Sequence, residues 1–181
     1  MKKSIIITMV IFIILAGCSS GKKTESFSKE DLGIIQMDSG KRIVYGMSRE
    51  EAEKVLGTGE KSDMGKYKYE SGVSIFYRND SVAAMFLDEE SKGKYSTTHD
   101  VEIGMLKQEV VKAYGEKYVS SPSEMNLDYV YDTNTNTFLN GYNTIKAKDA
   151  ESFYTISSTF DENGKLQRIL LLDCLFAIFM E

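Results

Sequence analysis

Histidine and cysteine, the residues that most often bind zinc or act as a catalytic base and nucleophile, are rare in this chain. His99 is the only histidine, and Cys18 and Cys174 are the only cysteines. With no second histidine and no cysteine near His99 in the sequence, the residues support neither a zinc site nor a serine or cysteine nucleophile paired with a histidine base. Its 27 acidic residues leave a carboxylate-based hydrolase open as an alternative. We therefore expect a protein that is not an enzyme and that needs no cofactor for catalysis.

One short segment begins like a calcium-binding loop. Asp132, Asn134 and Asn136 alternate in the way that the first ligands of such a loop do. The sixth position should be glycine but is Thr137, and the twelfth should be glutamate but is Asn143. Because the pattern fails at both positions, we expect no metal site there.

The N-terminal segment has the features of a secretory leader. Two lysines precede a largely apolar run over residues 5–15, and two small residues, Ala16 and Gly17, follow it. A bilayer-spanning helix needs about 20 apolar residues, so this run is too short to be a comfortable permanent span. The sequence therefore predicts a signal peptide over residues 1–17, with an uncleaved membrane anchor as the alternative.

The last residues of this leader, Leu15, Ala16 and Gly17, together with Cys18, resemble the bacterial lipobox. The resemblance implies that the Cys18 sulfur carries a diacylglycerol and that cleavage leaves Cys18 as an N-acylated first residue. Two or more acyl chains hold a protein firmly on a membrane, because each buried methylene contributes about 0.8 kcal/mol. The polar residues that follow predict an acylated tether over 18–31. We therefore expect a lipid-anchored protein on the exported face of the cell membrane, or on the outer membrane of a cell that has two membranes.

Composition and the second cysteine narrow the expectations further. The chain has 181 residues, of which 42% are hydrophobic, and this is enough for one or two small domains. Loss of the leader removes two of its 22 basic residues and none of its 27 acidic ones, which leaves a net charge of −7. Because no cluster of cations stands out, we expect no nucleic-acid partner. Acylation of Cys18 would leave no disulfide, and the apolar neighbours of Cys174 predict a buried, inert thiol.

The body of the chain contains one twelve-residue pattern twice. GMSREEAEKVLG at 46–57 and GMLKQEVVKAYG at 104–115 share five identities without a gap. Each copy predicts a short helix that ends at its last glycine, and in the first copy Ser48 and Glu51 form a capping box. The second copy has Leu106 in place of Ser48. Because leucine cannot cap the helix, the second helix should be less stable by about 1 kcal/mol. The sequence therefore predicts a duplicated unit.

Strand-like segments surround both helices. They lie at 33–37, 42–45, 66–69, 73–77, 82–87, 98–103, 128–131, 153–160 and 166–172, with a hairpin turn at Asn163 and Gly164. The apolar end at 174–181 is expected to be a last strand or a tail over a sheet edge, with a membrane-surface contact as the alternative. The sequence therefore predicts an α+β fold built as a tandem repeat, each half a short helix packed on an antiparallel β-meander. The halves are expected at 32–95 and 96–181, with both helices on one face of one continuous sheet or of two abutting sheets.

A glycine-methionine pair, a capped helix and aromatic antiparallel strands, as found over 46–87 and 104–172, resemble the repeat of the β-lactamase inhibitory protein. More distantly, they resemble the small lipoprotein of the outer-membrane assembly machine. The resemblance implies noncatalytic binding or scaffolding proteins. This chain departs from the inhibitor because it has no tryptophan and no disulfide in each repeat, so inhibition of a β-lactamase is not implied.

Aromatic residues recur at corresponding places in the two halves and are the candidates for a contact surface. Such rigid side chains are favoured at interfaces. The second half also carries a polar insertion over 132–152, and connections of that length are usually functional or disordered. The candidate binding residues are Tyr67, Tyr69, Tyr77, Tyr129, Tyr131, Phe138 and Tyr142. Core packing for the tyrosines and a merely mobile loop for the insertion are the alternatives.

These expectations combine into one functional hypothesis. We expect the protein to be a membrane-anchored lipoprotein of the cell envelope that acts as a noncatalytic binding module for a protein or an extracellular polymer. The simplest partner is an envelope or extracellular protein. A structural scaffold of an envelope assembly is the first alternative, and the carboxylate-based hydrolase is the second.

Overall fold

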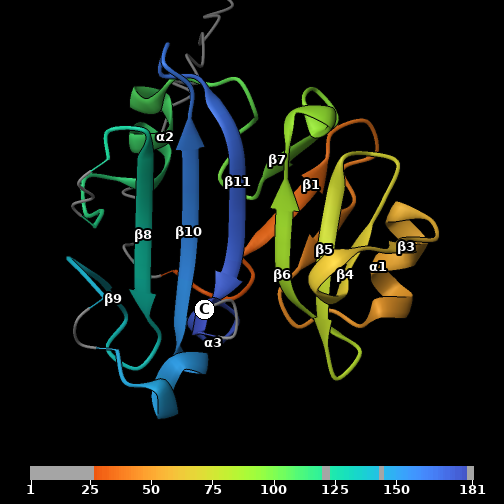
Figure 1. Ribbon diagram of the computed structural model, residues 1–181, viewed down its shortest axis with the longest axis horizontal. Helices are drawn as coiled ribbons and strands as arrows, with labels where there is room; N and C mark the ends of the chain where they lie inside the picture. Colours follow the sequence, from red (N-terminus) through yellow and green to blue (C-terminus); the bar gives the residue numbers. More distant parts are fainter. Residues whose placement is uncertain (1–26, 120–122, 143–144, 179–181) are drawn as a thin grey trace, which may run out of the picture.

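The computed structural model describes residues 27–119, 123–142 and 145–178 (Figure 1). The expected signal peptide, the acylation site Cys18 and most of the expected tether lie outside these residues. Within them the chain forms a mixed structure of helix and sheet that is mostly strand, and the strands pair in antiparallel fashion. The α+β class expected from the sequence is therefore confirmed.

The strands of the described residues form two sheets. The larger sheet contains β3 (Glu60–Lys61), β4 (Lys66–Lys68), β5 (Val73–Arg78), β6 (Ser81–Leu87), β8 (Asn126–Asp132), β9 (Thr137–Leu139), β10 (Phe153–Phe160) and β11 (Leu166–Asp173). Their order across the sheet is β3-β4-β5-β6-β11-β10-β8-β9. The smaller sheet contains β1 (Gly33–Gln36), β2 (Arg42–Val44) and β7 (Tyr95–Thr97), in the order β2-β1-β7. The meanders of both halves therefore share one continuous sheet, because β6 pairs with β11, and β1, β2 and β7 form a separate smaller sheet.

Helices connect or cover these strands. The α-helices are α1 (Arg49–Leu56), α2 (Lys107–Tyr114) and α3 (Cys174–Ile178), and the short 3-10 helices are η1 (Asp63–Gly65), η2 (Glu89–Ser91) and η3 (Ala147–Ser152). Ser48 Oγ accepts the Glu51 backbone N–H at 3.3 Å, and Glu51 accepts the Ser48 N–H in return, which is the expected capping box of α1. At α2 only half of the box can form, because leucine has no acceptor; the Leu106 N–H donates to Glu109 at 2.8 Å. Both predicted helices are confirmed.

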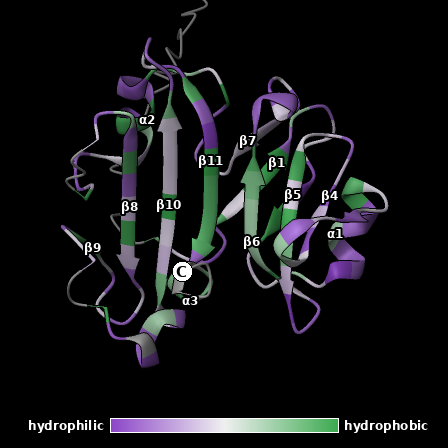
Figure 2. Cartoon of the chain, in the orientation of Figure 1, coloured by the Kyte–Doolittle hydropathy of each residue, from purple (hydrophilic) through white to green (hydrophobic). Residues whose placement is uncertain are grey.

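One hydrophobic core lies between the larger sheet, the smaller sheet and the helices α1 and α2. Ala52 of α1 and Val110 of α2 are fully buried and belong to the same cluster as Ile75, Met85 and Ile169 of the larger sheet. In Figure 2 the central strands and β1 carry much of the hydrophobic colouring, whereas α1 presents hydrophilic residues on its outer turns. Both helices therefore pack on one face of the larger sheet, as expected; we call this the inner face.

Residues 174–178 of the apolar end form the helix α3, so the prediction of a last strand is wrong there. Asp173 Oδ1 accepts the backbone N–H of Phe176 at 2.9 Å and so satisfies a donor in the first turn of α3. Phe176 packs against Phe76 and Phe86 on the outer face of the larger sheet. Cys174 is buried, as expected, and burial raises the pKa of its thiol.

Two other local predictions are wrong. Residues 98–103 form a turn instead of a strand, because Thr97 Oγ1 accepts the Val101 N–H at 3.2 Å and Asp100 adopts a left-handed φ of 58°. The insertion over 132–152 is not a loop without secondary structure, since it contains β9 and η3. β9 pairs with β8 and extends the larger sheet at one edge.

A buried charged pair ties the last strand to the first half of the chain. Asp173 is fully buried, and its two carboxylate oxygens accept from the Arg78 guanidinium at 2.6 and 3.0 Å. The Tyr45 hydroxyl donates to the same carboxylate at 2.5 Å. Burial, and then the adjacent Asp173 carboxylate, raise the pKa of Tyr45, which keeps the hydroxyl protonated as a donor. The pair therefore fixes β11 against β5 and the segment after β2.

Candidate functional site

The seven aromatic residues predicted as a contact surface separate into buried and accessible ones. Tyr69, Tyr129 and Tyr131 are at most 1% exposed, so the alternative of core packing is the correct one for these three tyrosines. Their rings belong to the core cluster on the inner face of the larger sheet, so their assignment to a contact surface is wrong. The accessible ones are the partly buried Tyr67, Tyr77 and Phe138 and the exposed Tyr142.

The accessible tyrosines of the first half are already engaged by their own neighbours. The Arg49 guanidinium carbon of α1 lies 3.8 Å from the centre of the Tyr67 ring, and the Arg49 Nε pairs with Glu53 at 2.8 Å. Tyr77 packs edge-on against Tyr67 and shares a 2.6 Å hydrogen bond with Tyr69. Cation–π and aromatic contacts of this kind stabilise α1 on the sheet. This group is therefore better explained as packing than as a recognition site.

Phe138 of the second half borders a cavity of about 640 Å³. The aromatic walls of this cavity are the rings of Phe27, His99, Tyr114 and Phe138, and we call it the aromatic cavity. Its volume falls within the range of about 300–1,000 Å³ that is usual for ligand pockets. The aromatic cavity is therefore the candidate functional site.

Four separate segments supply the walls of the aromatic cavity. Phe27 precedes β1, His99 lies in the turn after β7, Tyr114 ends α2, and Phe138 is the middle residue of β9. Tyr114 is held toward the cavity because Val110, four residues earlier on the same helix face, is anchored in the core. Pairing of β9 with β8 holds Phe138 at the edge of the larger sheet.

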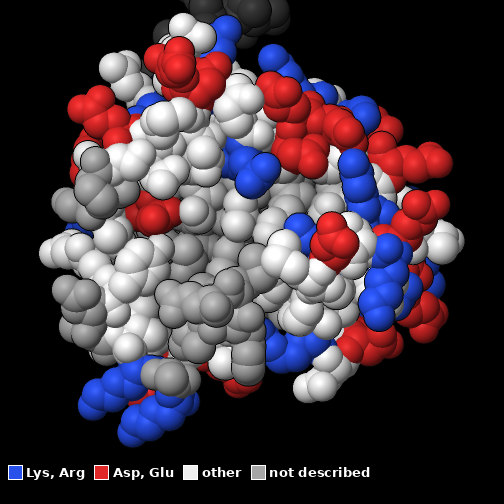
Figure 3. Space-filling model, in the orientation of Figure 1, with Lys and Arg blue, Asp and Glu red and all other residues white. Residues whose placement is uncertain are grey.

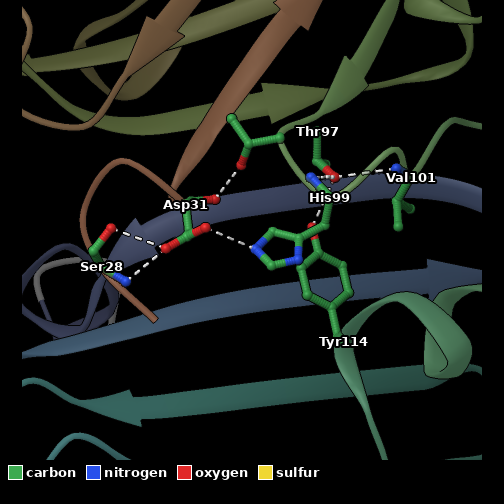
Figure 4. Close-up of polar contacts among 7 residues, drawn as sticks. Ser28, Asp31, Thr97, His99, Val101 and Tyr114 are labelled. Atoms are coloured by element: carbon green, nitrogen blue, oxygen red, sulfur yellow. Dashed lines mark hydrogen bonds and ion pairs between the residues drawn. The ribbon is translucent and has the colours of Figure 1, made fainter. Parts of the chain in front are cut away.

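Hydrogen bonds orient two of these rings (Figure 4). His99 Nε2 lies 3.1 Å from Asp31 Oδ1, and Asp31 Oδ2 accepts from the backbone N–H and the hydroxyl of Ser28 at 2.8 and 2.9 Å. The Tyr114 hydroxyl donates to Thr97 Oγ1 at 2.8 Å. A carboxylate thus orients the imidazole, and a threonine orients the phenol.

Ring contacts join the walls to one another. Phe27 is stacked on His99 with ring centres 5.5 Å apart and 20° between the ring planes, and Tyr114 contacts His99 at 4.9 Å. Phe138 meets Phe27 edge-on at 5.8 Å. Aromatic pairs of this geometry contribute about 0.5–1.5 kcal/mol each beyond their burial. The cavity therefore presents ring faces and edges to whatever enters it.

The rim of the aromatic cavity is polar and carries both signs of charge. Exposed Lys112 and Glu116 border it at the end of α2, and Asn136 and Thr137 border it at the start of β9. On the face of the molecule shown in Figure 3, charged side chains gather toward α1 and β4, and the part over β8 and β10 is mostly neutral. Apolar walls with a few polar groups at the rim are the usual composition of binding pockets.

Sequence reasoning identifies only a small part of this site. Of its walls, Phe138 alone is among the residues that the sequence marks, and His99 is noted there only as a lone histidine. Phe27 and Asp31 fall within the tether expected over 18–31. Phe27 is buried and Asp31 contacts His99, so the described end of that tether is packed on the folded body and the prediction is wrong there. Asp31 and His99 are 68 residues apart, and no spacing pattern relates them.

The calcium-like spacing at the start of the insertion belongs to a turn. Asp132 Oδ1 accepts the Asn134 N–H at 2.8 Å, and Asp132 Oδ2 accepts the Thr135 hydroxyl at 2.9 Å. Aspartate commonly stabilises turns in this way. Across the described residues, no group of three or more His, Cys, Asp or Glu side chains is placed to hold a metal ion.

No protein-family model matches the chain, and neither the curated proteins nor the solved structures contain a significant match to it. In the part of the chain that the structure describes, no helix is both long enough and apolar enough to cross a membrane. What the site can do must therefore be inferred from its own residues.

Ionisation of the buried tyrosines is expected to destabilise the fold at alkaline pH. Burial raises the pKa of Tyr114 and of Tyr129 above the usual value near 10. These groups should leave the free energy of unfolding unchanged below about pH 9 and lower it as the pH rises beyond about 10, because the tyrosines of the unfolded chain lose their protons first. Urea unfolding over a pH series measures this, and Tyr114→Phe should make the fall less steep. A stability that stays level into strongly alkaline solution would contradict the prediction.

Proposed function

We propose that this protein is a membrane-anchored lipoprotein of the cell envelope that acts as a noncatalytic binding module. A diacylglycerol and an N-acyl chain on Cys18 would tether it, and its body would bind a protein or an extracellular polymer. The lipobox-like residues before Cys18 support the tether. The binding role is carried by one observation, the aromatic cavity of about 640 Å³ with four aromatic walls.

The surroundings of His99 favour binding over catalysis. Its Nε2 contacts Asp31, and the imidazole packs against both Phe27 and Tyr114. These contacts hold the ring in one orientation as part of the cavity wall. The Asp31–His99 pair is therefore proposed to hold the wall in place.

The position of the cavity along the chain suggests that it works close to the membrane. Phe27 follows Cys18 by nine residues. Nine extended residues reach at most about 30 Å, because each spans no more than 3.3–3.6 Å. With Phe27 seated in the wall, the cavity would stay within that distance of the acylated cysteine. The proposed partner is therefore one that comes near the exported surface of the membrane.

We further propose that the body is the tandem repeat inferred from the sequence. In the first half the Gly46 N–H donates to the Val82 carbonyl at 2.8 Å, and in the second half the Gly104 N–H donates to the Leu166 carbonyl at 2.7 Å. Each glycine precedes a helix of the same length, and each carbonyl belongs to the last strand of the meander that follows. These matching bonds support duplication and the likeness to noncatalytic binding repeats.

Cross-linking in intact cells tests the binding role. Lys112 at the rim supplies an amine for a lysine-reactive cross-linker, and mass spectrometry would identify what is joined to it. Loss of an aromatic anchor commonly costs an interface 2 kcal/mol or more. Phe138→Ala is therefore expected to reduce recovery of the partner by about tenfold or more.

The matched control is Met64→Ala, which removes an exposed apolar side chain at the opposite edge of the larger sheet. It should leave recovery unchanged. Equal recovery of the same partner by the wild type, Phe138→Ala and Met64→Ala would show that the aromatic cavity is not the contact site. Repeated failure to recover any partner would count against the binding module itself.

A further inference from the structure

The segment that leads into β1 forms one wall of the aromatic cavity; we call residues 27–31 the strap. Phe27 is 6% exposed, and its ring stacks on His99 and meets Phe138 edge-on. At the other end of the strap, the Asp31 carboxylate lies 3.1 Å from His99 Nε2. The strap therefore sits on the site as a bound peptide would, with an aromatic ring and a carboxylate four residues apart.

Few hydrogen bonds join the strap to the rest of the folded chain. It lies outside the strands of the described residues, and the side-chain bonds of Ser28 run to Asp31 within the strap itself. Thr98 Oγ1 donates to the Asp31 carbonyl at 2.5 Å, and His99 contacts the Asp31 carboxylate. Segments held by a few side-chain contacts open at a lower free energy than paired strands do. Release of the strap would break these contacts and those of the Phe27 ring, which also include Tyr131 at 5.4 Å, but it would leave the strand pairings of both sheets intact.

We propose that the strap is a detachable internal ligand of the aromatic cavity, and that the ligand it imitates is a polypeptide segment with an aromatic side chain and a nearby carboxylate. The inference rests on the proposed binding function and assigns a ligand class to that site. Phe27 and Asp31 show which groups such a segment would supply. The Phe27 ring stacks on the His99 imidazole, and the Asp31 carboxylate contacts His99 Nε2. The aromatic cavity of about 640 Å³ lies beside the Phe27 ring, so release of the strap would enlarge the cavity.

An internal ligand competes with any external one. The strap belongs to the same chain, so its effective concentration at the cavity is on the order of mM. An external segment binds only those molecules whose strap is released, and its apparent Kd rises in proportion. Release also frees the strap residues to lengthen the proposed tether. Partner binding and the reach of the body from the membrane are thereby coupled.

Peptide binding to the full chain, purified in detergent, tests the proposal. The probe is a fluorescein-labelled peptide with the sequence of residues 24–32, and fluorescence polarisation reports its binding. Phe27→Ala is expected to bind the peptide at least about tenfold more tightly than the wild type, because the competing ring is gone. Adding Phe138→Ala to that variant should abolish binding, as should replacing the phenylalanine of the peptide by alanine.

A second variant addresses the chance that the Phe27 ring is needed for folding. Asp31→Asn weakens the contact with His99 and leaves every ring in place. Its hydrogen exchange should be faster over residues 27–31 and unchanged in β10 and β11, and it should bind the peptide more tightly than the wild type. Exchange that stays slow in the strap, or that rises equally in β10 and β11, would show that the strap is a permanent part of the core.

Three other outcomes overturn the proposal. One is global unfolding of Phe27→Ala, and another is a folded Phe27→Ala that does not bind the peptide. A third is binding of a fluorescent fatty acid in place of the peptide, which would make an acyl chain the ligand. The two proposals fail separately, because the peptide assay needs no native partner. A partner captured through the cavity without peptide binding would refute only the ligand class, and peptide binding without any captured partner would refute only the envelope role.

Discussion

Asp173→Ala is expected to lower the free energy of unfolding by about 3–5 kcal/mol, because it removes one partner of a buried charged pair. The carboxylate is fully buried and accepts from Arg78 at 2.6 and 3.0 Å and from the Tyr45 hydroxyl at 2.5 Å. Its loss would leave the Arg78 side chain, which is only 23% exposed, without this counter-ion, and the Tyr45 phenol without its acceptor. Urea unfolding of the purified protein, followed by circular dichroism, measures the change.

Two further variants separate the charged pair from side effects of the substitution. Arg78→Met combined with Asp173→Leu removes both charges, and it should cost much less than Asp173→Ala, because apolar residues of similar volume often replace a buried pair without loss. Asp149→Ala removes an exposed carboxylate on η3 and should change stability by no more than about 0.5 kcal/mol. If Asp173→Ala proved as mild as Asp149→Ala, the pair would not be what fixes β11 to the first half.

Cys18→Ala is expected to abolish membrane attachment completely. In the proposed anchor the Cys18 sulfur carries the diacylglycerol, and alanine has no atom that could accept it. Several acyl chains hold a protein firmly because each buried methylene contributes about 0.8 kcal/mol, and the variant would lose all of them. Labelled palmitate and detergent-phase partitioning measure the effect. The wild type should take up the label and enter the detergent phase, and the variant should do neither.

Cys174→Ala is the matched control for the acylation experiment. Cys174 is 3% exposed and lies at the start of α3, so its loss should leave both labelling and partitioning unchanged. Recovery of the wild type at full length inside the cell, with a free thiol at Cys18, would refute the lipid anchor. The binding role of the aromatic cavity would then have to be tested in that compartment.

Elements held together by neighbouring residues are the ones that sequence reasoning predicts well. Ser48 and Glu51 start α1 through bonds that span three residues, and Gly57 ends it with a φ of 82°. The aromatic and β-branched residues over 153–160 predict β10 with both of its ends. In each case the deciding interactions lie within a few residues of the chain, so the local pattern is sufficient.

Predictions fail where the deciding contact comes from a distant part of the chain. Residues 174–178 form α3 and not a strand, because Phe176 packs against Phe76 and Phe86 on the outer face of the larger sheet. The insertion over 132–152 gains β9 because β8 offers it an edge to pair with. Neither partner can be located from the apolar or polar character of the segment alone.

The same division applies to the fold and to the candidate site. The sequence by itself determined the mixed helix and sheet class, the two short helices and the scarcity of histidine and cysteine, because these depend on composition and on short-range pattern. Only the tertiary structure decided that Tyr129 and Tyr131 are core residues, whereas Phe27, His99 and Phe138 border a cavity. Burial depends on which strands pair and which segments cross them, and pairings such as β6 with β11 bring together residues that share no spacing in the chain.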